Sequence, residues 1–311
     1  MKKYFIYFIF VLFFISTILG LIIILNQSPT KSEKKEFVSK KYAKDKIAVV
    51  DLVGEIYFRD STSSFIKKDT DYYVTKLTTL FKRKDVKGII LKINSPGGSV
   101  AAVQRLYHQI IRLKSQYNKP VVCYVSELCA SGGYYVASAC DKIISCEGGV
   151  IGSVGVILQV GNISGLLKKI GVNIEVIKSS KYKDVGSMFR EMLPEERQMF
   201  ESLVNTAYEQ FISAIVDGRK LNKEEVMKFA DGRVFIAPQA VELKMIDAIG
   251  DEEDAVEEVK NLAKIKGSVE IIREKPTIFD FLQQATSETK LGLQQYNFVN
   301  LKKFRFEYMF E

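Results

Sequence analysis

The sequence predicts an α/β domain that follows an N-terminal membrane-spanning segment. Short β-branched runs alternate with amphipathic stretches over most of the chain, which is typical of an α/β fold. Two glycine-rich turns, at residues 94–99 and 129–135, each follow such a run and precede a helical pattern. A chain of 311 residues with 47% hydrophobic residues is long enough to bury a core of this kind.

The expected helices and strands follow in chain order from the apolar pattern. A strand at 46–52 precedes a helix at 70–84, whose apolar side chains recur at helical spacing. A buried-type strand at 89–93 leads through the first glycine turn into a helix at 100–114, with Ser99 as its N-cap. The remaining expected elements are strands at 120–125, 142–144, 154–157, 174–177 and 269–272, and helices ending at 137, covering 163–170 and starting at 194.

The N-terminus has the pattern of an uncleaved signal anchor. Residues 4–25 carry no charge and are numerous enough to span a bilayer. No small-residue cleavage site follows them, since the first alanine is Ala43. We therefore expect an anchor over residues 1–27, and a lysine-rich linker without periodicity over 28–45.

The charge pattern argues against a nucleic-acid partner and leaves the membrane orientation undecided. The net charge is +8, but the lysines and arginines are scattered and many lie near acidic residues. Lysines flank the apolar run on both sides, so a count of positive charges does not decide which end faces the cytoplasm.

The spacing of the cysteines indicates a packing role. Cys123, Cys129, Cys140 and Cys146 lack the paired C-x-x-C spacing of a zinc site. Small apolar packing residues are the expected role, with one disulfide left open for a domain outside the cytoplasm. We expect no metal and no organic cofactor.

The second glycine turn combines a serine with exposed backbone. Ser131 precedes Gly132 and Gly133, which have no Cβ and therefore let a substrate approach the main chain closely. Adjacent parallel strands would bring this turn and the turn at 96–98 to the same edge of the sheet. A serine beside amides that can meet a developing oxyanion indicates acyl transfer.

The base for this serine is the open question. The sequence has one histidine, His108, which lies beside the apolar stripe of its predicted helix rather than at a turn. A Ser-His-Asp triad is therefore disfavoured, and a lysine with a neutral amine becomes the alternative base. Local context narrows the lysines to Lys178, Lys181 and Lys183, and composition does not choose among them.

An ordered set of motifs resembles the signature blocks of the signal peptide peptidase A family of membrane-anchored serine–lysine peptidases (family S49). The motifs are Asn94-Ser95-Pro96-Gly97-Gly98-Ser99, Ala130-Ser131-Gly132-Gly133-Tyr134-Tyr135, Gly152-Ser153-Val154-Gly155-Val156 and Lys181-Tyr182-Lys183-Asp184, followed by blocks at 216–219 and 231–234. The resemblance covers about residues 46–262. It implies a crotonase- or Clp-protease-like fold of repeated strand–strand–helix units.

The resemblance also implies a role for individual residues. Ser131 corresponds to the nucleophile, Lys183 to the general base and Ser153 to a serine whose hydroxyl helps hold that lysine. The amides that fall where the family has its oxyanion hole are those of Gly132 and of Gly98, with Gly97 as the alternative to Gly98. Two departures are local: Ile236-Ala237-Pro238 replaces a more usual Thr/Ser-Gly, and Asn94 stands where aspartate is common.

Further expectations concern assembly and location. The chain has the length of the family's short form, in which neighbouring subunits of a dome-shaped ring supply the serine and the lysine of one site. This implies a homo-oligomer, with an octamer expected. The peptidase domain would cover 46–265, and 266–311 would pack on it or on a neighbouring subunit. The family also implies the bacterial inner membrane, with a cytoplasmic N-terminus and the catalytic domain on the outer side.

The expected function is that of a serine endopeptidase that degrades remnant signal peptides after their release from preproteins. Its expected partners are signal peptides and other extended hydrophobic peptides, together with the bilayer through residues 4–25. The alternatives are a membrane-protein quality-control protease of the same family, a crotonase-type enzyme acting on coenzyme A thioesters, and a catalytically silent scaffold.

Overall fold

The computed structural model describes residues 45–58, 68–273 and 305–309, together with isolated positions between 4 and 18. The chain divides into two units, Met1–Tyr42 and Ala43–Glu311. The described positions of the first unit are helical. Among the described residues, no helix is both long enough and apolar enough to cross a membrane. Most of the predicted anchor and linker lies outside those residues.

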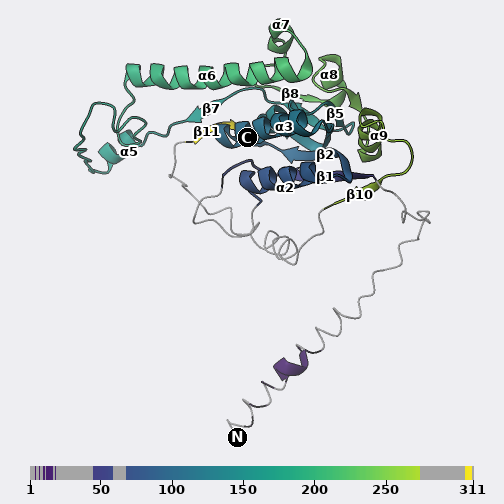
Figure 1. The fold of residues 1–311 in the computed structure, drawn as a ribbon. Coiled ribbons are helices and arrows are strands. Elements are labelled where there is room, and N and C mark those ends of the chain that lie inside the picture. The colour runs from purple at the N-terminus through teal and green to yellow at the C-terminus, as the bar shows by residue number, and fades with distance from the viewer. Residues whose placement is uncertain are drawn as a thin grey trace. The chain divides into compact units, whose positions relative to one another are not determined.

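An eight-stranded sheet forms the centre of the second unit (Figure 1). Its main path runs in the order β10-β1-β2-β4-β5-β9, and all of these pairs are parallel. The strands are β1 (Lys46–Val53), β2 (Val86–Ser95), β4 (Val121–Ala130), β5 (Lys142–Ser145), β9 (Ala248–Ile249) and β10 (Glu270–Ile272). Beyond this path, β6 (Val150–Gly152) pairs with β4 and with β8 (Val234–Ile236).

Helices cover both faces of the sheet, which explains why the central strands are apolar on both sides. On β1, Ala48 and Val50 belong to the larger core, which they share with residues of α2, α3, α4 and α6. The alternating residues Ile47 and Val49 pack in a second core with α9. The helices are α2 (Thr70–Lys82), α3 (Val100–Tyr117), α4 (Gly132–Ala137), α5 (Ser164–Lys169), α6 (Pro194–Arg219), α7 (Lys223–Met227), α8 (Ala237–Glu242) and α9 (Glu252–Leu262).

A small second sheet lies beside the first glycine turn. It consists of β3 (Gly97–Ser99), β11 (Arg305–Met309) and β7 (Ile157–Gln159), in the order β3-β11-β7. Both of its pairings are antiparallel. A strand from the C-terminal end of the chain therefore lies between two earlier segments of the second unit.

Several predicted elements are confirmed with shifted ends, and two strands are wrong. The predicted strand at 154–157 is broken, because Gly152 and Ser153 both have positive φ and separate β6 from β7. The predicted strand at 174–177 is not a strand, because its apolar residues are exposed and pair with no neighbouring strand of the described sheets. The helix from Thr70 ends two residues earlier than expected, at Lys82, where the chain becomes extended.

The cysteines confirm the packing interpretation. All four are free thiols, and Cys123, Cys129 and Cys140 are buried in the larger core. Burial raises the pKa of the Cys123 thiol well above its ordinary value. These three side chains therefore act as small apolar residues under the helices.

Candidate active site

Ser131 lies at the junction of β4 and α4. Its backbone has a positive φ (φ 50°, ψ −118°), a strained conformation for a residue with a side chain. Its amide donates a 2.7 Å hydrogen bond to the Gly152 carbonyl, and only 1% of the residue is exposed. The Ser131 Oγ is buried and has no hydrogen-bond partner within the described residues. The backbone therefore orients this hydroxyl, and no base among the described residues is hydrogen-bonded to it.

The two glycine turns lie side by side, as their strands predict. Parallel pairing of β2 with β4 brings the carboxyl ends of both strands together. A Cβ placed on Gly132 would lie 3.2 Å from both the Gly97 Cα and the Gly98 nitrogen. It would also clash with the Val103 side chain. Glycine at position 132 therefore leaves room for the Val103 side chain and for the tight approach of the first turn.

The Gly97–Gly98 peptide is held in one orientation by the loop after β1. Ile56 donates a 2.8 Å hydrogen bond to the Gly97 carbonyl. Because the C=O and N–H of a trans peptide point in opposite directions, the Gly98 N–H faces away from Ile56. The side that it faces is occupied by β11, where Tyr308 is paired with Gly98.

Ser153 lies next to the serine turn. The pairing of β4 with β6 sets Ala130 opposite Gly152, so the residues that follow each strand are neighbours. Ser153 has a φ of 51° and is 8% exposed, and its amide donates a 2.8 Å hydrogen bond to the Arg233 carbonyl. The structure thus gathers Ser131, Ser153 and the glycines Gly97, Gly98 and Gly132 at one end of the sheet.

His108 is not brought to the serine. It lies on the exposed side of α3, and its ring meets Tyr107 edge-on with centroids 5.3 Å apart. It lines a groove of about 1050 Å³, whose other walls include Gln104 and Gln210. Since the Ser131 Oγ has no hydrogen-bond partner among the described residues, those residues form no serine–histidine pair.

The strand β11 runs along the first glycine turn as an extended chain. Tyr308 lies opposite Gly98 and Met309 opposite Gly97, while Glu307 pairs with both β3 and β7. The Tyr308 carbonyl is so near Gly97 that a Cβ on that glycine would clash with it. The candidate oxyanion-hole backbone therefore has room for a paired strand only because residue 97 is glycine.

The Tyr308 side chain fills a buried aromatic pocket. It is fully buried, with its ring centroid 5.1 Å from that of Tyr135 and 5.0 Å from that of Phe211. Its hydroxyl donates a 2.8 Å hydrogen bond to the Ala207 carbonyl. Such a pocket accepts an aromatic body and satisfies a polar tip, which matches the chemistry of tyrosine.

Lys183 lies in the segment between α5 and α6. This segment is at the N-terminal end of α6, away from the sheet (Figure 1). Lys183 is exposed, and its backbone is held by a turn in which its amide donates to the Ser180 carbonyl at 3.3 Å. It does not contact the Ser131 Oγ, which has no partner among the described residues.

Of the three lysines that are candidate bases from the sequence, two form ion pairs with carboxylates. Lys178 pairs with Asp184 at 2.5 Å, and Lys181 pairs with Glu195 at 2.7 Å. Lys183 has no ion pair with any described residue. Among these candidates it is therefore the one amine that no acid in this part of the chain holds.

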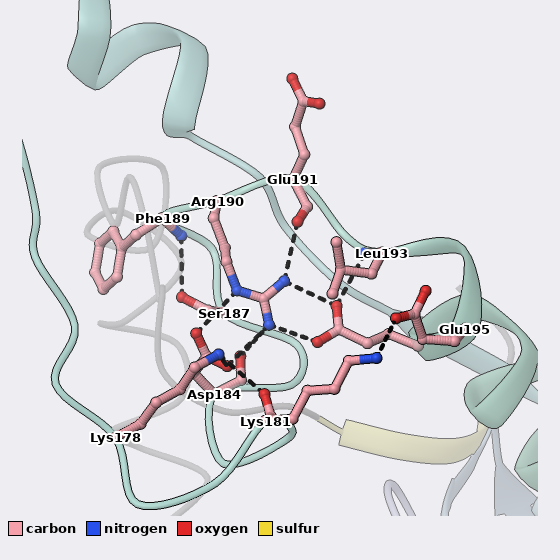
Figure 2. Close-up of polar contacts among 10 residues, drawn as sticks. Lys178, Lys181, Asp184, Ser187, Phe189, Arg190, Glu191, Leu193 and Glu195 are labelled. Carbon is pink, nitrogen blue, oxygen red and sulfur yellow. Dashed lines mark hydrogen bonds and ion pairs between the residues drawn. The ribbon is translucent and has the colours of Figure 1, made fainter.

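Arg190 organises the segment that carries Lys183 (Figure 2). Its Nε lies 2.9 Å from the Asp184 Oδ2, and its Nη1 lies 2.8 Å from the Glu196 Oε2. Hydrogen bonds from Arg190 lower the pKa of both carboxyls. This contact was not predicted from the sequence, although Asp184 and Arg190 flank a turn beside the proposed base.

Comparison with known proteins agrees with the motifs. The model of Peptidase family S49 matches residues 113–266, and the model of Clp protease matches residues 56–150. The second match supports the predicted Clp-protease-like α/β fold.

Three relatives extend this comparison over most of the chain. A protein of Methanocaldococcus jannaschii named as a protease, MJ0651, is 35% identical over 269 residues, which are 85% of this chain and 84% of the relative. A Synechocystis protein named as a protease, slr0021, is 39% identical over 66% of this chain and 73% of its own length. An Enterococcus faecium protein named as a signal peptide peptidase, SppA, is 32% identical over 71% of this chain and 64% of its own.

The match to the first relative spans most of both chains, and the family model covers the segment that contains Ser131, Ser153 and Lys183. The chain therefore belongs to peptidase family S49, the signal peptide peptidase A family, and is a serine-type protease.

Proposed function

We propose that this protein is a membrane-anchored serine endopeptidase that degrades remnant signal peptides after their release from preproteins, using a dyad of Ser131 and Lys183. The observation that carries the proposal is the Ser131 Oγ, which is buried and without a hydrogen-bond partner beside the glycine backbone of two turns. A nucleophile held in a strained turn next to close-packed glycines suits attack on an acyl group.

In the proposed reaction, the Ser131 Oγ attacks the scissile carbonyl while the neutral amine of Lys183 takes the hydroxyl proton. The amides of Gly132 and Gly98 donate hydrogen bonds to the oxyanion that forms. The protonated lysine then gives its proton to the leaving amine as the peptide C–N bond breaks. Water, deprotonated by the lysine in turn, hydrolyses the acyl-enzyme and releases Ser131. Ser153, beside the serine turn, would help hold the amine of Lys183.

Substrate would bind as an added strand between β3 and β7. The chain's own β11 supports this, since it lies there as an extended segment paired on both sides. Strand addition obtains affinity from backbone hydrogen bonds and specificity from pockets for alternate side chains. Signal-peptide remnants are extended, hydrophobic chains of the kind that such a groove accepts.

The dyad would be completed between subunits of a homo-oligomeric ring, with eight copies expected from the family's short form. Two observations support this: no base among the described residues is hydrogen-bonded to the Ser131 Oγ, and Lys183 is exposed without an ion pair to any of those residues. Exposed apolar side chains also gather on this part of the chain, namely Leu166, Ile170, Ile177, Met199 and Leu203. A second copy packing there would remove them from water.

The proposed location is the bacterial inner membrane. Residues 4–25 would anchor the chain, with the N-terminus in the cytoplasm and the peptidase domain on the outer side. A reporter that is active only outside the cytoplasm, fused to the C-terminus, would be active under this proposal. If a C-terminal reporter that works only in the cytoplasm is active instead, the peptidase domain lies on the cytoplasmic side and the proposed orientation is wrong.

The test of the dyad is cleavage of a signal peptide by the full-length protein. Ser131→Ala and Lys183→Ala should each abolish turnover, because neither attack nor proton transfer can proceed. Lys223→Ala is the matched control, since Lys223 is an exposed lysine that pairs with Glu209 on another part of the fold. Retained turnover in Lys183→Ala would show that Lys183 is not the base.

A further inference from the structure

We propose that Arg190 is a positioning residue that keeps the carboxylate of Asp184 away from Lys183, so that Lys183 remains available as a base. The inference rests on the proposed Ser131–Lys183 dyad and names what prepares the lysine half of that dyad. It follows from the contacts of the segment between α5 and α6, shown in Figure 2.

The chemical problem is set by the sequence. Lys183 is followed immediately by Asp184. A carboxylate close to an amine stabilises the protonated ammonium form of that amine. A protonated lysine cannot accept the proton of a serine hydroxyl. A base beside an aspartate therefore works best if another cation occupies that aspartate.

Both oxygens of Asp184 are occupied. Arg190 approaches with its fork, Nε at 2.9 Å from Oδ2 and Nη2 at 3.0 Å from Oδ1. Lys178 adds its Nζ at 2.5 Å from Oδ1. Bidentate guanidinium–carboxylate pairs are directional as well as strong, so this arrangement also fixes where the carboxylate points.

The other side of Arg190 is tied to α6. Its Nη1 lies 2.8 Å from the Oε2 of Glu196, whose side chain is fully buried in the first turn of the helix. The same Glu196 oxygen accepts a 2.9 Å hydrogen bond from the Leu193 amide. Arg190 thus joins the turn at Asp184 to a buried point of the long helix, which leaves little freedom for Asp184 to turn toward Lys183.

The other charged groups of the flanking chain segments also leave Lys183 without an ion pair. They lie on α5, on the segment itself and on the first turns of α6, and they are Lys168, Lys169, Glu175, Lys181, Glu191, Glu195 and Arg197. Glu195 is taken by Lys181 at 2.7 Å, and none of the others forms an ion pair with Lys183 among the described residues. Lys178 and Arg190 carry two positive charges against the two negative charges of Asp184 and Glu196, so this network is balanced without Lys183.

Arg190 could also serve only to hold the segment in place. This anchoring role and the proposed shielding role predict different pH dependence of activity. The measurement is kcat/KM of the full-length protein on a signal peptide across pH. If Arg190 shields Lys183, Arg190→Gln releases Asp184 to pair with the lysine. The acidic limb of the profile should then move to higher pH by about one unit, which lowers kcat/KM about tenfold at a pH below the limb.

The double variant Arg190→Gln/Asp184→Asn separates shielding from anchoring. Removal of the released carboxylate should return the acidic limb toward its original pH. Asp184→Asn alone should leave the limb within a few tenths of a unit of the original. If Arg190→Gln lowers kcat without moving the limb, or if the double variant keeps the shifted limb, the shielding role is overturned.

Lys178→Gln covers the outcome that Arg190→Gln does not fold, since the Glu196 carboxylate would then be buried without its partner. Lys178 is a partly exposed contact to the same Asp184 oxygen, so its loss should move the limb in the same direction by a smaller amount. Lys223→Gln, in an exposed pair with Glu209, should leave the limb unmoved. An unmoved limb in a folded Lys178→Gln, or in a folded Arg190→Gln, would contradict the proposal.

A readout without turnover separates this proposal from the dyad itself. In a Ser131→Ala background, an amine-acylating reagent followed by mass spectrometry reports the neutral fraction of Lys183 as a function of pH. Arg190→Gln should shift the acylation curve of Lys183 to higher pH and leave that of Lys223 in place. An unshifted curve refutes the shielding by Arg190, whereas full activity of Lys183→Ala refutes the dyad.

Discussion

The serine turn and the lysine segment are built by opposite means. Ser131 stands between a buried strand and a helix whose six residues are all buried, within the larger core. Lys183 stands in a segment that is exposed over most of residues 171–183 and is held by ion pairs around Arg190.

This difference indicates when each half of the site is prepared. Folding of one chain is enough to strain Ser131 and to place it beside Gly97 and Gly132, because the core determines those positions. Ion pairs at a surface are weaker and more easily rearranged than packed side chains. The lysine half therefore depends on its own charge network and, in our proposal, on a neighbouring copy.

The largest effect is expected from mixing two inactive variants. Ser131→Ala and Lys183→Ala chains should each be inactive alone, but co-assembled in equal amounts they should recover about a quarter of the wild-type activity. A site between two subunits is intact when one supplies the serine and the other the lysine, which occurs by chance at about one interface in four. The measurement is signal-peptide cleavage after co-expression.

The control mixes Ser131→Ala with Lys183→Ala after each has assembled separately, so that subunits do not exchange. It should show no recovered activity. If the co-expressed mixture also stays inactive while subunits are shown to mix, both residues of one site come from the same chain. The serine and lysine regions of a single protomer would then come together to form one site.

The next largest effect is expected at Gly97, where a methyl group would occupy the space taken by the Tyr308 carbonyl. Gly97→Ala should lower kcat/KM by at least about a hundredfold, because a bound strand could no longer present its carbonyl to the oxyanion-hole backbone. Gly267→Ala is matched, since Gly267 has φ +110° against +108° for Gly97 but nothing within 4 Å of its Cβ position. It should keep its activity, and equal losses in both variants would attribute the effect to backbone strain alone.

A smaller effect is expected from weakening the chain's own strand in the groove. Tyr308→Ala removes the aromatic contacts and the hydroxyl hydrogen bond that hold β11 in its pocket. An added peptide would then compete with a weaker occupant, so its KM should fall by about two- to tenfold. Tyr124→Ala removes a buried tyrosine from the other core and should leave KM unchanged. A rise in KM for Tyr308→Ala would show that β11 builds the groove rather than occupying it.

The sequence predicted the serine half better than the lysine half, and the reason is the same difference in construction. The runs at 46–52, 89–93 and 120–125 predicted β1, β2 and β4, because strands buried on both faces leave a continuous apolar pattern. Their parallel order then predicted that the two glycine turns meet. The run at 174–177 has a similar pattern but no partner strand, and pairing depends on the whole fold.

Contacts between residues far apart in the chain could not be predicted from the sequence, for a related reason. The strand β11 pairs with β3 and β7 across most of the chain length, and nothing in its local pattern names those partners. The tie from Arg190 to Asp184 and Glu196 depends on how a segment without regular structure folds back. The helix α9 was not predicted, although its start carries sequence signals: Asp251 caps it and acidic residues fill its first turn.

The free energy of unfolding should depend more on acidic residues packed around the main sheet, such as Asp247, than on those of the lysine segment, such as Asp184. Burial alone would raise the pKa of Asp247, but hydrogen bonds from Arg219 and from the Ile143 amide lower it overall. Because the pKa of Asp247 is lower in the folded state, its carboxylate stabilises the fold at pH values above the unfolded-state pKa of about 3.9. This stabilisation is lost as the pH falls through the folded-state pKa. Asp247→Asn should therefore cost about 1–2 kcal/mol at neutral pH, allowing for its partial exposure, and flatten the loss of stability below about pH 4.

The measurement is urea unfolding at several pH values, with Asp184→Asn as the comparison in the lysine segment. Asp184→Asn should change global unfolding less than Asp247→Asn, because its partners lie in the exposed segment rather than between β5 and α6. An equal or larger loss in Asp184→Asn would mean that the lysine segment is part of the cooperative core, contrary to the contrast drawn here.

The smallest effect is expected at His108. This is the residue that a search for a serine protease triad would choose first, as the chain has no other histidine. It lies on the exposed side of α3 against Tyr107, and it gives the Ser131 Oγ no hydrogen bond. His108→Ala should therefore keep kcat/KM within about twofold of wild type, since exposed substitutions away from a site change little. A strong loss in His108→Ala together with retained activity in Lys183→Ala would move the base from the exposed segment into the packed half of the molecule, and the two regions would no longer divide the chemistry between them.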